Sequence, residues 1–160
     1  MSTIVGGLMI FVSCSFIGFS AARVYRLRVS QLEAFLKLIR HIKAQIGYFC
    51  SPISSIIDGY EDEILSGCGF LLAARELGAG GGFESCRARL FLSEAESDEL
   101  GCFFSGLGSH SADEEKNGCE YYEKTLGAEL EKERSELAKR TKLCRTFGML
   151  AGVLLAVLLI

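Results

Sequence analysis

The chain ends in F-G-M-L-A-G-V-L-L-A-V-L-L-I, residues Phe147 to Ile160, a run of fourteen residues without a charged side chain. Four cations stand just before it: Lys139, Arg140, Lys142 and Arg145. This pattern is typical of a membrane anchor, because the apolar run enters the hydrocarbon while the cations stay with the lipid headgroups. As a helix the run measures about 21 Å, so it needs snorkelling or local bilayer thinning to cross a core of about 30 Å. A buried C-terminal core helix is the alternative.

A second uncharged run lies at the other end of the chain, from Ile4 to Ala22. As a helix it spans about 28 Å, nearly the thickness of a bilayer core. Three arginines follow it: Arg23, Arg26 and Arg28. A cleaved signal peptide is the alternative, but such a signal begins with basic residues and here none precedes the apolar run. We therefore expect a first anchor over residues 1–22.

The basic residues predict the topology. One cluster follows the first apolar run and the other precedes the last, and positively charged flanks stay on the cytoplasmic side. Both clusters therefore belong to one cytoplasmic domain over residues 23–146, which lies between anchors at 1–22 and 147–160. Two spans return the chain to its starting side, so this topology is self-consistent.

Composition indicates an all-α chain. The 160 residues include one Pro and no Trp, 49% are apolar, and the mean hydropathy is +0.30. The net charge of −3 gives no indication of nucleic-acid binding. The predicted fold class is an all-α, membrane-anchored helical bundle with transmembrane helices at both ends.

Apolar spacing and capping signals predict the helices between the anchors. Residues 31–49 carry a helical stripe. Ser51 is the expected N-cap of the next helix, in which Pro52 takes the first helical position and which continues to Tyr60. A helix over 61–77 is weakened or split by Gly67 and Gly69, and Gly78–Gly82 is the expected loop. Further helices are predicted over 83–91, over 93–107 and from Ser111 toward Arg145. Ser93 and Glu96 fit a capping box, and the last helix is the longest and continues into the tail. It carries a stripe of residues at helical spacing: Cys119, Tyr122, Leu126, Leu130, Leu137, Thr141 and Cys144.

No motif points to catalysis, a metal or a cofactor. The seven cysteines include no C-x-x-C, and neither histidine has a Cys or His at ligand spacing, so zinc is not expected. We expect the cysteines to be small buried thiols in a reducing compartment. The glycine-rich stretch lacks the Lys and Ser/Thr of a phosphate-binding loop, and there is no nucleophile elbow or H-E-x-x-H. We expect a protein that is not an enzyme.

Several stretches resemble the stage III sporulation protein AB family over nearly the whole chain. They are Gly18-Phe19-x-x-Ala22, Ile46-Gly47-Tyr48, Ser51-Pro52-Ile53, Gly106-Leu107-Gly108 with Asp113, and the ending from Lys142 to Gly152. The ending, with its Leu143, Gly148, Leu150, Ala151 and Gly152, is the most specific of these stretches.

The resemblance implies a role in endospore formation. It implies a protein of the mother-cell membrane facing the forespore, within a secretion-like, multi-protein channel complex. Its soluble domain would be similar to the cytoplasmic domains of type II secretion F, or platform, proteins. The implied partners are the lipid bilayer, other stage III sporulation proteins and a cytoplasmic secretion-type ATPase, and homo-oligomerisation is left open. The implied function is a non-enzymatic scaffold that couples the ATPase to the membrane assembly.

The predicted partner-binding residues are Tyr48, Ser51 and Pro52, because a capped turn there lies close to the helical stripe. The alternative is that Tyr48 and Pro52 only pack the helical hairpin. The rival class for the whole protein is a small self-assembling membrane pore or a redox-active membrane protein. A pore needs polar stripes that Val153–Ile160 lacks. A redox protein needs paired or quinone-side thiols, and Cys14 is the only thiol deep in a predicted span.

Overall fold

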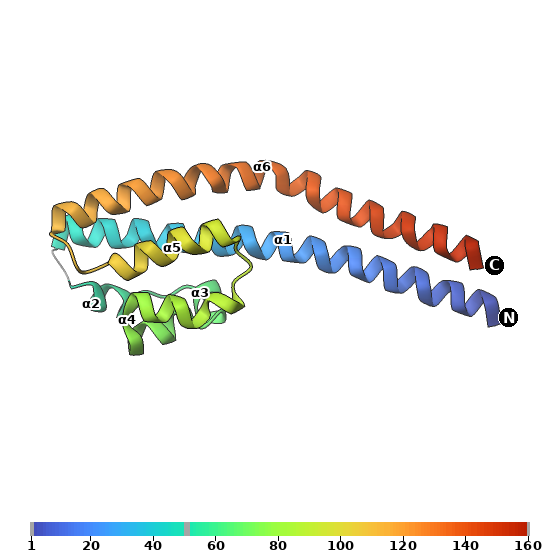
Figure 1. The fold of residues 1–160 in the computed structure, drawn as a ribbon, viewed down its shortest axis with the longest axis horizontal. Helices are drawn as coiled ribbons and strands as arrows, with labels where there is room; N and C mark the ends of the chain where they lie inside the picture. The colour runs from blue at the N-terminus through green and yellow to red at the C-terminus, as the bar shows by residue number, and fades with distance from the viewer. Residues whose placement is uncertain (1, 50–51, 160) are drawn as a thin grey trace. The chain divides into compact units, whose positions relative to one another are not determined.

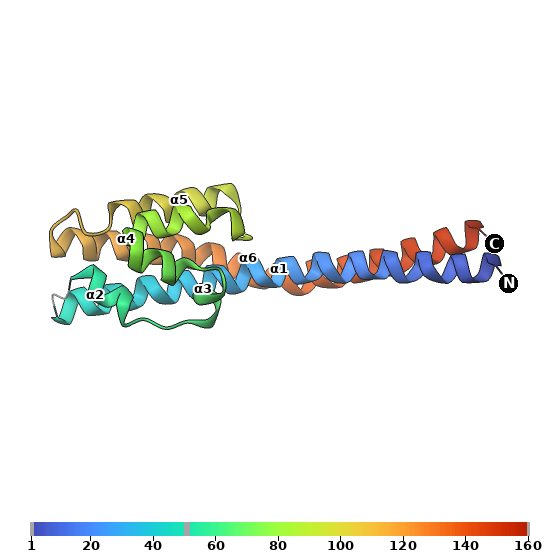
Figure 2. The same ribbon diagram turned by 90° about the horizontal axis from the view of Figure 1, so that it is seen from below.

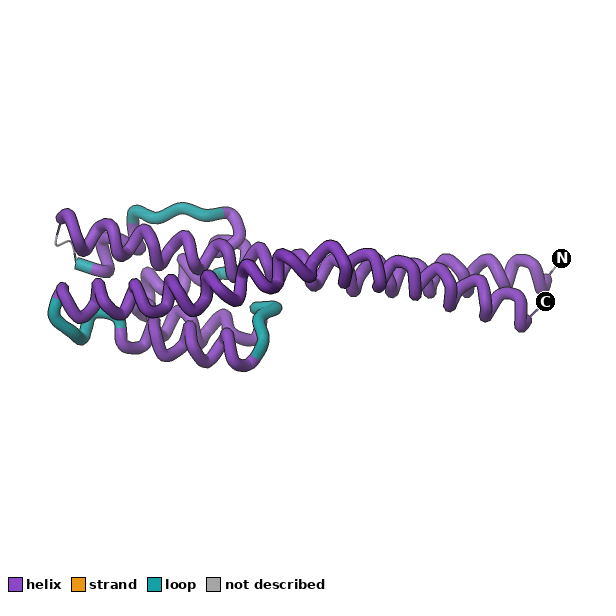
Figure 3. The backbone as a smooth tube through the Cα atoms, turned by 90° about the horizontal axis from the view of Figure 1, so that it is seen from above, coloured by secondary structure: helices purple, strands orange, loops and turns teal. Residues whose placement is uncertain are grey.

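The computed structural model describes the backbone of residues 2–49 and 52–159, and it contains helices and no strand within those ranges (Figures 1 and 3). The side chains of 48 and 49, and of many residues in 2–21 and 144–159, lie outside the description. The helices are α1 (Ser2–Phe49), α2 (Ile53–Asp58), α3 (Glu63–Gly67), α4 (Phe70–Cys86), a 3-10 helix η1 (Arg87–Arg89), α5 (Glu94–Gly106) and α6 (Ala112–Leu159). The all-α prediction is confirmed.

The two long helices, α1 and α6, each contain 48 residues. The prediction that the last helix continues into the C-terminal tail is confirmed, because α6 runs unbroken to Leu159. The helix predicted over 31–49 is likewise the second half of α1. Three residues of the predicted stripe of α6 are buried, namely Cys119, Leu126 and Leu130. Tyr122, Leu137 and Thr141 are half-buried, and the side chain of Cys144 lies outside the description.

Capping residues define the shorter helices. The side chain of Asp62 accepts hydrogen bonds from the backbone N–H groups of Ile64 and Leu65 and so starts α3. Ser93 and Glu96 form the predicted capping box at the start of α5. At the start of α6, the backbone N–H and the hydroxyl of Ser111 donate to Glu114, at 3.1 and 2.9 Å.

The predicted loop at Gly78–Gly82 is wrong. Only Gly78 departs from helical geometry, with φ 77° and ψ 169°, and helix resumes after it within α4. The chain turns back at Gly78 and brings Gly82 against Ala74: a Cβ on Gly82 would lie 2.5 Å from the backbone nitrogen of Ala74. The glycines therefore permit a close contact between the two halves of α4 rather than a loop. The helix predicted over 61–77 is split, as expected. α3 ends at Gly67, and α4 begins after Gly69, whose φ is 83°.

Two other boundaries differ from the prediction. Pro52, expected at the first helical position, is the cap residue before Ile53, in an extended conformation with φ −63° and ψ 141°. The helix expected over 83–91 ends at Cys86, and η1 follows before the chain becomes extended at Leu90. Boundaries of short helices are the least specified by sequence, because few residues carry each signal.

Phe35 is the centre of the core. Its ring lies 5.3, 5.7 and 5.8 Å from the rings of Phe70, Phe83 and Phe104, measured between centroids. All four side chains are fully buried. The cluster joins α1 to both halves of α4 and to α5, and Figure 2 shows α4 and α5 side by side. Aromatic burial of this extent is a major contribution to folding.

The chain divides into two compact units, Arg28–Glu131 and the pair Met1–Leu27 with Lys132–Ile160. We call the first the bundle unit and the second the terminal unit. Within the terminal unit the guanidinium of Arg140 lies 5.6 Å from the ring centroid of Tyr25 and pairs with Glu136. Among the described residues, no helix offers a stretch long and apolar enough to cross a membrane. The anchors at 1–22 and 147–160 stay a prediction.

Candidate partner-binding surface

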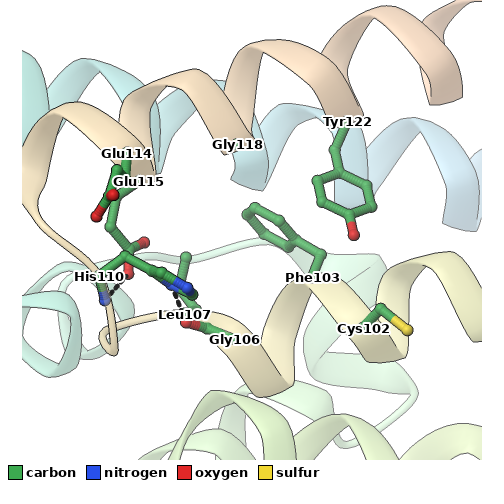
Figure 4. A pocket seen from close by; sticks show the side chains of 9 residues that line it. All are labelled: Cys102, Phe103, Gly106, Leu107, His110, Glu114, Glu115, Gly118 and Tyr122. Atoms are coloured by element: carbon green, nitrogen blue, oxygen red, sulfur yellow. Dashed lines mark hydrogen bonds between the residues drawn. The ribbon is translucent and has the colours of Figure 1, made fainter.

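The connection between α5 and α6 forms one side of a pocket in the bundle unit (Figure 4). α5 ends at Gly106, Leu107 is extended, and Gly108 has a φ of 90° that favours glycine. The pocket has a volume of about 320 Å³. It is lined by Cys102, Phe103, Gly106, Leu107, His110, Glu114, Glu115, Gly118 and Tyr122.

Glu115 shapes this connection. Its side chain is buried, and Oε1 accepts hydrogen bonds from the backbone N–H groups of Gly108 at 2.5 Å and His110 at 3.4 Å. Hydrogen bonds from backbone N–H groups to a carboxylate are charge-assisted and therefore stronger than those between neutral groups. Hydrogen bonds from Ser111 hold the pKa of the neighbouring Glu114 below its usual range. The two carboxylates therefore order the turn on both sides of His110.

The polar groups of the pocket are separated from one another. Glu114, Glu115 and His110 lie at one end, Cys102 and the Tyr122 hydroxyl lie at the other, and Phe103 stands between (Figure 4). The rings of Phe103 and Tyr122 meet edge to face with centroids 5.0 Å apart. The Nδ1 atom of His110 lies 2.9 Å from the Ser109 hydroxyl and 3.3 Å from the Gly106 carbonyl oxygen. The arrangement offers contacts to a ligand but no thiol–imidazole pair.

A second pocket, of about 300 Å³, adjoins the same turn. It is lined by Ile46, Pro52, Ile53, Gly108, His110, Ala112 and Glu115. His110 and Glu115 belong to both pockets, so the α5–α6 connection separates them. We call the residues of these two pockets the turn surface. It combines exposed apolar atoms with an exposed imidazole, as protein-binding patches commonly do.

Of the three predicted partner-binding side chains, the structure describes that of Pro52. Pro52 is exposed and lies on the turn surface. Ser51 and the side chain of Tyr48 lie outside the described residues. The prediction that these residues bind a partner therefore stays a prediction. His41 is half-buried, with its ring centroid 5.1 Å from that of Tyr60.

A charged face lies on the bundle-unit parts of α1 and α6. Glu123 accepts hydrogen bonds from Arg40 at 2.8 Å and from Lys43 at 3.2 Å, and Lys43 also pairs with Glu120 at 3.1 Å. Partial burial raises the pKa of Glu123, but the two cations outweigh it and hold the pKa below its usual range. With Ala44, Gly47 and Lys116, this face encloses about 500 Å³.

Sequence reasoning did not single out Glu115 or Arg40. Both lie on long helices among many other charged residues, and their partners are 7 and 83 positions away. A sequence gives no distance between such groups, so no signal marked them. Within the described parts of the chain, no group of three or more His, Cys, Asp or Glu side chains could hold a metal ion.

Comparison with known proteins gives one family and no individual relative. No curated protein and no solved structure matches the chain significantly. The model of the stage III sporulation protein AB family matches residues 3–160, which is nearly the whole chain and includes both long helices. The chain therefore belongs to the stage III sporulation protein AB family.

Proposed function

We propose that this protein is a non-enzymatic scaffold in the mother-cell membrane that faces the forespore. Residues 1–22 and 147–160 anchor it, and the domain over 23–146 lies in the cytoplasm. It couples a cytoplasmic secretion-type ATPase to a channel-like assembly in the membrane. Family membership supports a sporulation-related role. The mother-cell location, the channel and the ATPase are what the resemblance to the family implies, and the two anchors rest on the apolar ends of the chain with their basic flanks.

The observation that carries the proposal is the continuity of α1 and α6. Each is one helix, Ser2–Phe49 and Ala112–Leu159, and the single proline of the chain, Pro52, lies in neither. Each helix therefore includes residues of the bundle unit and of an apolar chain end. A hydrogen-bonded helix resists bending and stretching, so a partner that displaces the bundle end of α1 or α6 also acts on the terminal end.

The basic clusters support the proposed orientation. Arg23 and Arg26 are exposed, as are Lys139 and Lys142, and all four flank the apolar ends of the chain. Exposed cations at these positions can contact anionic lipid headgroups on the cytoplasmic side, each contributing about 1 kcal/mol.

The turn surface is the proposed contact for the ATPase. It carries Pro52 and Ile53 from the α1–α2 side and His110 from the α5–α6 side, and Ile46 of α1, two residues before Tyr48, also lines it. A concave surface with apolar walls can receive a protruding side chain of a partner, and such anchors supply much of the binding energy at interfaces.

Co-purification of the full-length protein with the secretion-type ATPase of the sporulation complex tests this proposal. Tyr48→Ala and Pro52→Ala are expected to weaken binding about tenfold or more, with unchanged helicity and melting temperature. Glu76→Ala is the matched control, because Glu76 is exposed on α4, outside the turn surface. Equal binding by all variants, or a loss of stability that accounts for the loss of binding, would contradict the proposed contact.

A further inference from the structure

The fold-back of α4 at Gly78 brings the two ends of that helix together. Ala74 and Gly82 lie four residues to either side of Gly78, and their backbones are in contact. The same pairing continues outward: the rings of Phe70 and Phe83 have centroids 6.5 Å apart. At the open end, a Cβ on Gly69 would lie 3.1 Å from Nη1 of Arg89. Residues just before α4 therefore meet residues just after it.

Two thiols face each other at this junction. Cys68 is the cap residue that ends α3 and Cys86 is the last residue of α4, and their thiols are close enough for each to shift the pKa of the other. Cys68 is 7% exposed and Cys86 is fully buried. Each sulfur also lies 3.2 Å from a carbonyl oxygen three residues earlier, that of Leu65 or Phe83. Both sulfurs are therefore fixed in position.

Cys68 occupies the more activating environment of the two. Its sulfur accepts a hydrogen bond from the backbone N–H of Phe70, the first residue of α4, and the guanidinium of Arg89 lies nearby. The hydrogen bond from Cys86, then the Phe70 N–H and the Arg89 charge, outweigh burial and lower the pKa of Cys68 to about 7. The same hydrogen bond and burial raise the pKa of Cys86. A helix start and a cation are the usual means of making a cysteine nucleophilic.

We propose that Cys68 and Cys86 form a redox-active dithiol that a hydroperoxide oxidises to a disulfide. The Cys68 thiolate attacks the hydroperoxide, an S–O bond forms as the O–O bond breaks, and the alkoxide or hydroxide leaves and takes up a proton. The Cys86 sulfur then attacks the resulting Cys68 sulfenic acid, the S–S bond forms, and the oxygen leaves as water with the proton from Cys86. One hydroperoxide is reduced and two thiols are oxidised.

The product would link the end of α3 to the end of α4. It closes the chain segment between Cys68 and Cys86, which includes the whole fold-back, and so restricts the unfolded state. We expect the melting temperature of the oxidised full-length protein to exceed that of the reduced protein by about 5 °C or more. A thiol reductant is expected to reverse the change. This site is independent of the proposed scaffold function.

Peptide mapping of the full-length protein in detergent tests the proposal directly. The reduced protein is treated with hydrogen peroxide, its remaining thiols are alkylated, and trypsin separates Cys68 from Cys86 by cleaving at Arg75. The expected product is a reducible Cys68–Cys86 linkage that forms before the exposed Cys102 is oxidised. Oxidation of Cys102 while Cys68 and Cys86 remain reduced would overturn the proposal.

Single substitutions test the order of the two steps. In Cys86→Ser, the Cys68 sulfenic acid has no second thiol beside it and should be trapped by dimedone. In Cys68→Ser, Cys86 should stay reduced, because it is fully buried and burial favours its protonated thiol. Cys119→Ser is the control, since Cys119 is a buried thiol on α6 and its loss should leave the linkage unchanged. Oxidation of Cys86 at an undiminished rate in Cys68→Ser would contradict the assignment of Cys68 as the nucleophile.

Discussion

The backbones of Gly82 and Ala74 are in direct contact across the fold-back of α4. A Cβ on Gly82 would lie 2.5 Å from both the nitrogen and the Cα of Ala74, a distance that real Cβ atoms do not adopt. Gly82 is therefore required for packing rather than for loop flexibility. The contact positions Phe83 in the core and Cys86 beside Cys68.

Gly82→Ala is expected to destabilise the protein by about 2 kcal/mol, because the added methyl group forces the two halves of α4 apart. Gly127→Ala is the matched control: Gly127 lies inside α6, and a Cβ there would meet nothing within 4 Å. That variant should gain about 0.5–1 kcal/mol from the better helix propensity of alanine. Chemical unfolding of the full-length proteins in detergent measures both changes, and equal stability of the two variants would refute the close contact.

Phe104→Ala is expected to cost about 3–5 kcal/mol, because it removes a fully buried ring from the Phe35 cluster and leaves a cavity. Leu72→Ala provides the comparison, since Leu72 is 67% exposed on α4. That substitution should change stability by about 0.5 kcal/mol or less. Thermal melting followed by circular dichroism distinguishes them, and a small effect of Phe104→Ala would mean that the cluster is not the core.

The ion pair between half-buried Arg28 and buried Glu96 predicts a pH dependence. Arg28 donates to Glu96 at 3.0 and 3.2 Å, and Ser93 donates to the same carboxylate from its backbone N–H and hydroxyl. Burial raises the pKa of Glu96, but these hydrogen bonds outweigh it and the net shift is downward. The folded protein therefore binds this proton more weakly than the unfolded chain does.

The contribution of Glu96 to stability is thus complete above its unfolded pKa of about 4.3 and is lost as the pH falls through the lower folded value. Glu96→Gln should reduce the free energy of unfolding at pH 7 by about 1–3 kcal/mol and flatten the pH dependence below pH 5. Urea unfolding of both proteins from about pH 3 to about pH 7 measures the pH dependence of the free energy of unfolding. Parallel curves for the two proteins would show that Glu96 does not titrate as described.

Glu115→Ala is expected to loosen the turn between α5 and α6, because the N–H groups of Gly108 and His110 lose their acceptor. The cost should be about 0.5–1.5 kcal/mol, the net value of a hydrogen bond, because Gly108 and His110 are exposed and water can reach their N–H groups. Hydrogen exchange at Gly108 should become faster, while Glu115→Gln, which keeps the acceptor oxygen, should show a smaller change. Unaltered exchange at Gly108 in Glu115→Ala would contradict the role of Glu115.

The sequence predicted the long elements well and the α4 region poorly. Periodic apolar residues marked 31–49 and the stripe through Cys119, Leu126 and Leu130, and Ser93 with Glu96 marked the start of α5. A glycine cluster is compatible with two structures, a loop or a close contact between backbones, because glycine favours turns and also allows close backbone approach. Only the position of Ala74, eight residues before Gly82, decides between them, and a local pattern does not contain that information.

The candidate sites were less predictable than the fold. Pro52 was identified from its capped turn, but His110 and Glu115 joined it only through the meeting of α1, α2 and the α5–α6 connection. The Cys68–Cys86 pair gave no motif, because its geometry depends on the fold-back at Gly78. Three of the four cysteines whose side chains the structure describes are buried, as expected, and Cys102 is exposed.

Labelling of Cys102 in living cells tests the central claim most directly. Cys102 is an exposed native thiol of the bundle unit, so a membrane-impermeant maleimide can report which side of the membrane this unit occupies. The account predicts no label on the Cys102 peptide in intact cells, full label after permeabilisation, and no label in Cys102→Ser. A cysteine added after Ile160 should label from outside. Label on Cys102 in intact cells would place the bundle outside and contradict coupling to a cytoplasmic ATPase.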